Sequence, residues 1–485
     1  MRSLLLYFFI FTSFLISETS RVPSILNFPG FSKLVEAQRT HGRVLNDSTL
    51  LSSDISGVAS TPTLIESSKH TGGNATPNSV FGYATALEGD ILVVSASGLG
   101  FHGITKAGKV YVYKYNLGVA QYEKIAELKS TISPKESDIF GSNVVINGDV
   151  IVVSGIVDSN DDGQADKPEV YVFEKPELGW IDATANATLS VSDTVETYFS
   201  GRFLTMSGND IVFGGRVNTS EINRGAVYVF EKPNTGWIDA TENAKLTASD
   251  SIEMNTEFGI SVTISNDNIV VGAPDFTQNE MTNFSAIYIF EKPYTGWITT
   301  TEDAKLTASD VPINNIFGYS VGMSENTIIV GAPNIMTIDE VIQAGAAYIF
   351  EKPLSGWVDA NEDAKLMASN PIDLAYFGFS VAIDGNNIVV GDLVEFGLSA
   401  DDNITQLDAA YIFKKPLSGW MNATEDVKLI ASDAIEADGF SYSLSIDGDN
   451  IVVGAPIKDN EIGAVYHYKV KKQSVSPSVI IYLLN

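Results

Sequence analysis

The chain has 485 residues, no cysteine and a formal net charge of −30, because 60 acidic side chains outnumber 30 basic ones. This excess of negative charge argues against nucleic acids and anionic membrane surfaces as partners. Without cysteine, a disulfide framework, a thiol nucleophile and a zinc–thiolate site are all excluded.

The N-terminal residues 1–19 have the pattern of a secretory signal peptide. Arg2 provides a positive start, residues 4–16 are an apolar run, and small or polar residues follow. The run is too short to predict a membrane-spanning helix. We therefore expect export, with the mature protein secreted or extracellular at the cell surface. Residues 20–60 show little periodicity and are interpreted as a leader or linker, partly disordered.

From residue 81 onward one pattern recurs, with a spacing of 59 residues four times, then 60, then 63. Each copy holds four short runs of β-branched and aromatic residues bounded by Gly, Asn, Asp and Pro, which predict strands. Four antiparallel strands per copy predict an all-β fold, a seven-bladed β-propeller over residues 61–470. We expect the recurring phenylalanines that open the copies to be core residues. They are Phe81, Phe140, Phe199, Phe258, Phe317, Phe377 and Phe440.

Two motifs mark the copies, Phe-Gly at the first strand and Gly-Ala-Pro after the second. Phe-Gly is altered at 199–200 and 440–441, and Gly-Ala-Pro is intact at 272–274, 331–333 and 454–456. With these motifs, residues 80–468 resemble the FG-GAP repeats of integrin α-chain propellers and of many secreted bacterial proteins. The resemblance implies a propeller whose ligand-binding face is built from loops between strands. It implies no particular ligand.

Closing the ring requires a strand from outside the last copy. The copy at 440–468 has three strand-like runs, whereas the other six have four. Residues 63–68 precede Phe81 much as 365–369 precede Phe377, so we expect this N-terminal strand to pair with 464–468. Such pairing would remove an open sheet edge. The competing candidate is the apolar run 479–484 within the C-terminal tail 471–485, which is too short to cross a bilayer.

The loops divide between two faces, because strands A to D of each blade alternate in direction. The face with the A–B turns and C–D links is uniform. Its C–D link reads Glu-Lys-Pro-x-x-Gly-Trp in four copies, with Lys for Glu in a fifth, and holds all five tryptophans. We interpret these tryptophans as packing between blades rather than as sugar-stacking platforms. The B–C loops on the other face differ in every copy, and recognition concentrates on variable loops held by a rigid scaffold.

One B–C loop, residues 158–169, fits the calcium-binding pattern D-x-[DN]-x-[DN]-G-x5-E. Side-chain oxygens at alternate positions can converge on calcium, and the glycine permits a sharp turn. Integrin-like repeats carry a similar loop between strands A and B, whereas this one joins B and C. The alternative is a solvated acidic loop. We expect one Ca²⁺ site, with a backbone carbonyl from the fourth residue and side-chain oxygens from the others: Asp158, Asn160, Asp162, Gln164, Asp166 and Glu169.

Catalytic motifs do not meet their structural requirements. Residues 318–322 fit a serine nucleophile elbow, but the serine recurs within strand A of other copies and no helix follows. Residues 98–103 fit a dinucleotide motif, but a strand follows them. The four histidines share no motif. Seven sequons are compatible with glycosylation in a eukaryotic secretory pathway. They are Asn46, Asn74, Asn186, Asn218, Asn283, Asn403 and Asn422.

The sequence therefore predicts a non-catalytic binding or adhesion module, monomeric and extracellular, that recognises a protein or glycan through variable loops on one face. Calcium would support that face. One alternative is a glycan-binding lectin of propeller fold. Another is a non-catalytic part of a larger extracellular enzyme or surface assembly. An enzyme acting at a propeller face would need a convergent acid–base cluster, which the sequence does not reveal.

Overall fold

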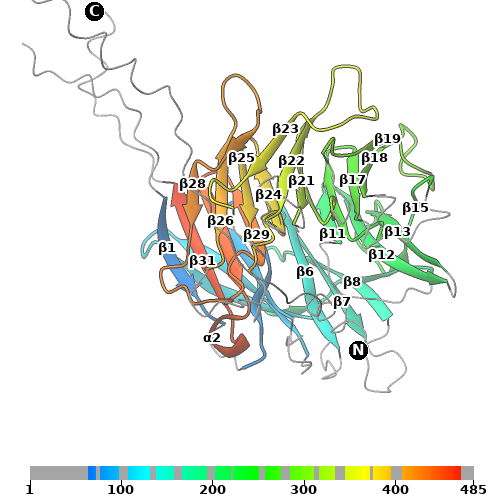
Figure 1. Ribbon diagram of the computed structural model, residues 1–485. Helices are drawn as coiled ribbons and strands as arrows, with labels where there is room; N and C mark the ends of the chain where they lie inside the picture. Colours follow the sequence, from blue (N-terminus) through cyan, green and yellow to red (C-terminus); the bar gives the residue numbers. More distant parts are fainter. Residues whose placement is uncertain are drawn as a thin grey trace, which may run out of the picture. The chain divides into compact units, whose positions relative to one another are not determined.

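In the computed structural model, Met1–Ser60 and Thr61–Asn485 are separate units. The described residues all belong to the second unit; they are 64–72, 77–97, 107–130, 138–157, 167–193, 203–219, 222–250, 257–274, 285–310, 316–333, 344–371, 375–394 and 407–470. They form seven sheets, the blades of a β-propeller (Figure 1). The predicted all-β, seven-bladed fold is thus confirmed. No described helix has the length and apolarity that a bilayer crossing requires.

Each blade has four main strands, A to D. Blade 1 contains β2 (Phe81–Glu88), β3 (Ile91–Ala96), β4 (Lys109–Asn116) and β5 (Gln121–Lys129). Blade 2 contains β6 (Ile139–Asn147), β7 (Val150–Val157), β8 (Lys167–Glu174) and β10 (Ala187–Ser190), and blade 3 contains β11 (Leu204–Ser207), β12 (Asp210–Thr219), β13 (Ile222–Glu231) and β15 (Ala244–Leu246). Blade 4 contains β16 (Ser261–Ser265), β17 (Asn268–Ala273), β18 (Ala286–Glu291) and β19 (Ala304–Leu306), and blade 5 contains β20 (Ser320–Ser324), β21 (Thr327–Ala332), β22 (Ala346–Glu351) and β23 (Ala364–Met367).

Blade 6 contains β24 (Ser380–Asp384), β25 (Asn387–Gly391), β26 (Ala410–Lys414) and β28 (Val427–Leu429). Blade 7 contains β29 (Ser443–Asp447), β30 (Asn450–Ala455), β31 (Ala464–Val470) and, as its outer strand, β1 (Leu64–His70). The short segment α2 (Lys458–Glu461) joins β30 to β31. Three short strands add in parallel to the outer strand of the preceding blade: β9 (Ala183–Thr184) to β5, β14 (Ala240–Thr241) to β10 and β27 (Ala423–Thr424) to β23.

The N-terminal strand closes the ring, as predicted. Figure 1 shows β1 beside β31, and the two pair antiparallel from Leu64↔Val470 to His70↔Val465. The register is shifted from the sequence-based alignment, which set 63–68 against 365–369. Lys69 lies opposite Tyr466 as Lys365 lies opposite Tyr348. Lys69 and Lys365 stand equally far along the chain before Phe81 and Phe377. The length of this link therefore sets the register of the outer strand.

Buried side chains fill the spaces between blades. Seven clusters are found among the described residues, each contributed by two neighbouring blades. Phe317 is fully buried and meets Tyr348 edge-on, with ring centroids 5.4 Å apart. The other recurring phenylalanines in the described residues are buried in the same way, so the prediction that they are core is confirmed. Phe199 lies outside the described residues.

The serine of strand A is a structural joint between blades. Ser320 is fully buried, and its hydroxyl donates a 2.8 Å hydrogen bond to the carbonyl oxygen of Gly378 in the next blade. Ser380 and Ser443 make the equivalent bonds to Ser441 and Gly82. A serine committed to a neighbouring backbone inside the core cannot serve as an exposed nucleophile. The structural interpretation of the Gly-x-Ser-x-Gly sequence is therefore confirmed.

Candidate functional site

The predicted calcium loop is for the most part outside the described residues. Of its six expected ligands, Glu169 alone is described, and it lies in β8, where its carboxylate accepts a 2.9 Å hydrogen bond from the Tyr171 hydroxyl. That carboxylate helps to raise the pKa of Tyr171, an effect that comes first from burial. Asp158, Asn160, Asp162, Gln164 and Asp166 lie outside the described residues. The calcium site stays a prediction.

The five tryptophans of the C–D links pack between blades, as expected. Their side chains are 5–9% exposed, and each belongs to a cluster shared with the preceding blade. The Trp297 indole donates to the Asp210 carboxylate at 2.9 Å, and the Lys292 ammonium joins the same carboxylate at 2.7 Å. These rings tie neighbouring blades together and offer no free face on which a sugar could stack.

An arc of four aromatic rings lies at the other end of the innermost strands. Tyr319, Phe379, Tyr442 and Tyr83 follow the Phe-Gly position in blades 5, 6, 7 and 1 and are partly exposed. Successive ring centroids are 5.3, 5.4 and 5.0 Å apart, so the rings form one continuous surface. Because strand A begins where the D–A link ends, this arc lies on the face of the variable loops.

The rings of the arc are tilted against one another rather than coplanar, with interplanar angles of 41–52°. Burial raises the pKa of the Tyr83 hydroxyl, and a hydrogen bond with Tyr442 partly offsets this effect. The arc is therefore a curved, neutral and largely apolar wall. Sequence reasoning missed it, although an aromatic residue after Phe-Gly or Phe-Ser in four copies was a visible signal.

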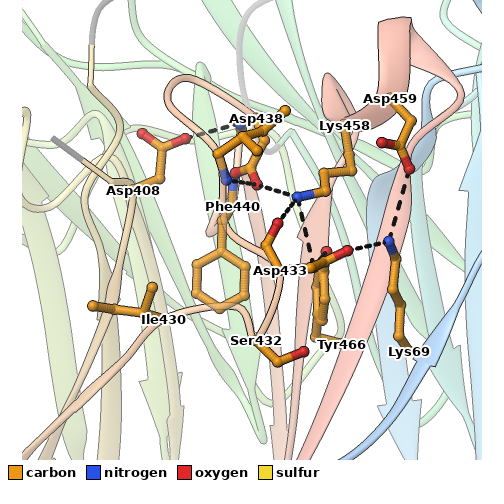
Figure 2. A network of polar contacts seen from close by, with 12 residues as sticks. Lys69, Asp408, Ile430, Ser432, Asp433, Asp438, Phe440, Lys458, Asp459 and Tyr466 are labelled. Carbon is orange, nitrogen blue, oxygen red and sulfur yellow. Dashed lines mark hydrogen bonds and ion pairs between the residues drawn. The ribbon is translucent and has the colours of Figure 1, made fainter. Parts of the chain in front are cut away.

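A buried polar network underlies the same face at blades 6 and 7 (Figure 2). Asp408 accepts backbone hydrogen bonds from Val394 and Gly439, each 2.8 Å long. Lys458 lies 3.1 Å from the Asp438 carboxylate and 3.5 Å from that of Asp433. Burial raises the pKa of Asp408 to about 8, and the neighbouring carboxylates Asp392 and Asp438 add to the shift.

The turn that presents Lys458 is strained. Asp459, Asn460 and Glu461 have φ values of 53°, 61° and 60°, a left-handed conformation that costs most residues roughly 1–2 kcal/mol each. The buried Lys458 contacts compensate part of that cost. Each acid of the network accepts hydrogen bonds from within the protein. We therefore assign the network a structural role, holding the D–A link of blade 6 against the B–C turn of blade 7.

Asp392 explains why blade 6 lacks Gly-Ala-Pro. In blades 4 and 5 the strand C tyrosine donates to an aspartate of the preceding D–A link, as Tyr348 does to Asp310 at 2.9 Å. The equivalent link residue before blade 6 is Asn370. Tyr411 instead donates at 2.7 Å to Asp392, which stands at the alanine position of the motif. Burial raises the pKa of Asp392 to about 7.

The FG-GAP repeat family model matches residues 240–290, 300–350, 360–413 and 423–468. Each match runs from the outer strand of one blade through the first three strands of the next. FG-GAP repeat sequences thus recur in four successive stretches of a seven-bladed β-propeller. No curated protein sequence matches the chain.

Several solved structures are similar to this chain. The C-terminal WD40 domain of Sif2 is 11% identical with a TM-score of 0.46, covering 85% of this chain and 99% of that one. Sqt1 of Saccharomyces cerevisiae is 8% identical with a TM-score of 0.42, covering 85% and 99%. The β-propeller domain of the Trilobed protease of Pyrococcus furiosus, described as having an open velcro topology, is 10% identical with a TM-score of 0.41, covering 81% and 94%.

Proposed function

We propose that this protein is a secreted or cell-surface binding module without catalysis of its own, which recognises an extracellular protein through the face of the B–C loops and D–A links. The observation that carries the proposal is the aromatic arc of Tyr319, Phe379, Tyr442 and Tyr83. Contiguous, partly exposed aromatic rings mark interaction surfaces, and aromatic residues dominate the energetics of protein interfaces. Loops that differ in every copy would surround this anchor and supply specificity.

A protein ligand fits the arc better than a glycan. Sugars stack on flat aromatic faces, whereas the rings of the arc are inclined to one another and curve around the axis. A curved apolar wall suits a side chain inserted from a partner. The buried tryptophans remove the repeated sugar platform that the lectin alternative requires. Export rests on the N-terminal signal pattern, and the Asp158 loop would bind calcium and order one side of the same face.

The test is binding of labelled protein to intact cells and matrix from the source organism. A double variant, Tyr319→Ala with Phe379→Ala, should reduce binding by more than about tenfold, as loss of interface hot spots does. The matched control is Leu354→Ser with Leu417→Ser, two fully exposed side chains at the tips of C–D links on the opposite face. Unchanged binding by the arc variant, with loss in the control, would contradict the proposal. Protease and glycosidase treatment of the cells separates a protein ligand from a glycan.

A further inference from the structure

One blade carries a histidine at a position that is aliphatic in every other blade. The middle residue of the strand C aromatic triplet is valine or isoleucine in blades 1 to 6: Val112, Val172, Val229, Ile289, Ile349 and Ile412. In blade 7 it is His467, whose side chain is 0% exposed. An ionisable ring has thus replaced a core hydrocarbon at one place in the repeat.

Both ring nitrogens of His467 are engaged. Nδ1 lies 2.6 Å from the Ser67 hydroxyl on β1, and Nε2 lies 3.1 Å from the side-chain oxygen of Asn450 on β30. Aromatic rings of blade 1 enclose it, with Tyr122 at 5.1 Å and Tyr115 at 5.8 Å between centroids. His467 therefore contacts the closing strand, its own blade and the next blade at once.

A second histidine lies on the closing strand itself. His70 of β1 packs against Tyr113 at 5.8 Å and Tyr122 at 6.1 Å between ring centroids. Its pKa is lowered by burial. The cluster between blades 7 and 1 contains no tryptophan, unlike the five clusters sealed by C–D links. The two histidines and their tyrosines fill the joint where the two ends of the propeller meet.

The closing strand is held in its blade by non-covalent contacts alone. In blades 1 to 6 the chain continues directly from strand C into strand D. In blade 7 the outer strand β1 comes from the N-terminal end of the propeller and pairs with β31 without a direct chain connection. Its polar contacts include Lys69 to Asp433 at 2.6 Å, Glu66 to Ser432, and Ser67 to His467. These contacts add to the antiparallel ladder between β1 and β31, and opening that ladder would break no covalent bond.

We propose that His467, together with His70, makes the ring closure acid-sensitive, so that protonation of these rings releases β1 from β31 and opens the propeller between blades 7 and 1. The groups that face His467 do not favour its cationic form. Lys469 and His70 are themselves cationic or become so in acid, and Ser67, Asn450, Tyr115 and Tyr122 are neutral. The carboxylates of Asp447 and Asp90 act on the neighbouring Tyr122 hydroxyl, whose pKa is raised first by burial and then by these charges and Tyr115.

The direction of the pH effect follows from the pKa shift. Burial, with contributions from Lys469 and His70, lowers the pKa of His467 to about 4, below the ordinary 6.5. His467 on β31 binds a proton more readily when β1 is released than when it is paired, so closure is complete above about pH 6.5 and weakens as the pH falls towards about 4. The ion pair between Lys69 of β1 and Asp433 persists between about pH 6.5 and about pH 4. Although burial opposes the shift, hydrogen bonds from Lys69 and Tyr466 lower the pKa of Asp433 to about 2.

Hydrogen exchange of the full chain, corrected for intrinsic rates, tests this proposal. A pKa of about 4 in place of 6.5 predicts about a 30-fold rise in exchange within β1 between about pH 7.5 and about pH 5. Strand β22 of blade 5 is the internal reference and should show no comparable rise. The matched variant is His467→Ile, which restores the residue of the other blades and should abolish most of the rise. An unchanged rise in that variant, or an equal rise in β22, would overturn the proposal.

A direct titration guards against a variant that fails to fold. The ring resonances of His467 in the wild-type chain should titrate well below those of an exposed histidine. A titration midpoint of His467 at or above about pH 6.5 would mean that burial does not disfavour the protonated ring, and it would contradict the proposal. This outcome is independent of ligand binding, because the measurement uses the protein alone.

Discussion

The hydroxyl of Ser261 in blade 4 donates a 2.7 Å hydrogen bond to the carbonyl oxygen of Gly318 in blade 5. This contact explains the two motifs of the repeat together. Gly318 has φ +91°, which turns its carbonyl towards the preceding blade, and a β-carbon on Gly272 would lie 2.1 Å from that oxygen. Phe-Gly, Ser and Gly-Ala-Pro are thus parts of one joint that lets adjacent blades approach backbone to backbone.

Substituting Gly272 with alanine should therefore destabilise the propeller by about 1–3 kcal/mol or more, because the added methyl group meets backbone that cannot move away. Gly385 is the matched control. It lies in an A–B turn with φ +53° and nothing within 4 Å of an added β-carbon. Gly385→Ala should cost less than Gly272→Ala, about 1–2 kcal/mol, from the positive φ alone. If urea denaturation gave equal losses of unfolding free energy for the two variants, Gly272 would not be part of a close contact between blades.

Truncating Phe317 to alanine should cost roughly 3–5 kcal/mol, because a fully buried ring leaves a cavity beside Tyr348. Ligand affinity per folded molecule should stay unchanged, since the ring lies inside the core and not on the arc. Thermal unfolding and a binding titration on the folded fraction separate the two effects. Lost binding with unchanged stability would show that Phe317 is a ligand contact.

Two tryptophans offer a matched test of the interblade contacts. The Trp297 indole is bonded to Asp210, whereas the buried indole N–H of Trp237 has no hydrogen-bond partner among the described residues. Replacing either by phenylalanine removes similar packing. Trp297→Phe should cost about 1–3 kcal/mol more, because a buried carboxylate loses a donor. Similar denaturation midpoints for the two variants would argue that these hydrogen bonds contribute little.

The buried carboxyl group of Asp392 should make stability fall as the pH rises. Its folded pKa of about 7 exceeds the ordinary 3.8, so its contribution is fully present below about pH 4 and is lost towards pH 7. Asp392→Asn should remove part of that slope, because an amide does not ionise and the Tyr411 hydroxyl can turn to accept from it. Parallel plots of unfolding free energy against pH for the two proteins would show that Asp392 does not titrate in this range.

Calcium should bind at the Asp158 loop with a dissociation constant of about 10⁻⁴–10⁻³ M, the range of extracellular modules. Calorimetric titration of the metal-stripped protein should give heat that disappears in the Asp158→Ala, Asp162→Ala variant. The thermal stability of the propeller should change little on calcium removal, because the other six copies lack this sequence pattern. Equal heats from both proteins, or none at millimolar calcium, would leave a solvated acidic loop.

The sequence alone was enough to predict the blades and the closing strand, because both depend on a regular spacing of apolar residues and on a missing outer strand. The contacts within the joints required coordinates. Ser67 and His467 are 400 residues apart, so nothing local marks the histidine as part of the closure. In the sequence, Asp392 is only a departure from Gly-Ala-Pro. The structure shows that it accepts the hydrogen bond of Tyr411, for which the link residue of this blade is Asn370 rather than an aspartate.

The aromatic arc was not predicted from the sequence pattern. The residue after Phe-Gly varies between copies, so it is no fixed part of the repeat motif. Only the ring geometry shows that Tyr319, Phe379 and Tyr442 contact one another from three blades. The variable face was expected to recognise ligand through its loops. In the proposed function, the arc adds an anchor formed by the first strands of four blades.

Site-specific photocrosslinking on living cells tests the recognition face most directly. A benzophenone amino acid is placed at Phe379 in the arc or, in a second protein, at Leu354 on the opposite face, and crosslinked material is identified by mass spectrometry. We expect the probe at position 379 to capture a defined extracellular protein that the probe at position 354 does not. Capture from position 354 alone, or crosslinks to glycan without protein at position 379, would contradict recognition of a protein through the arc.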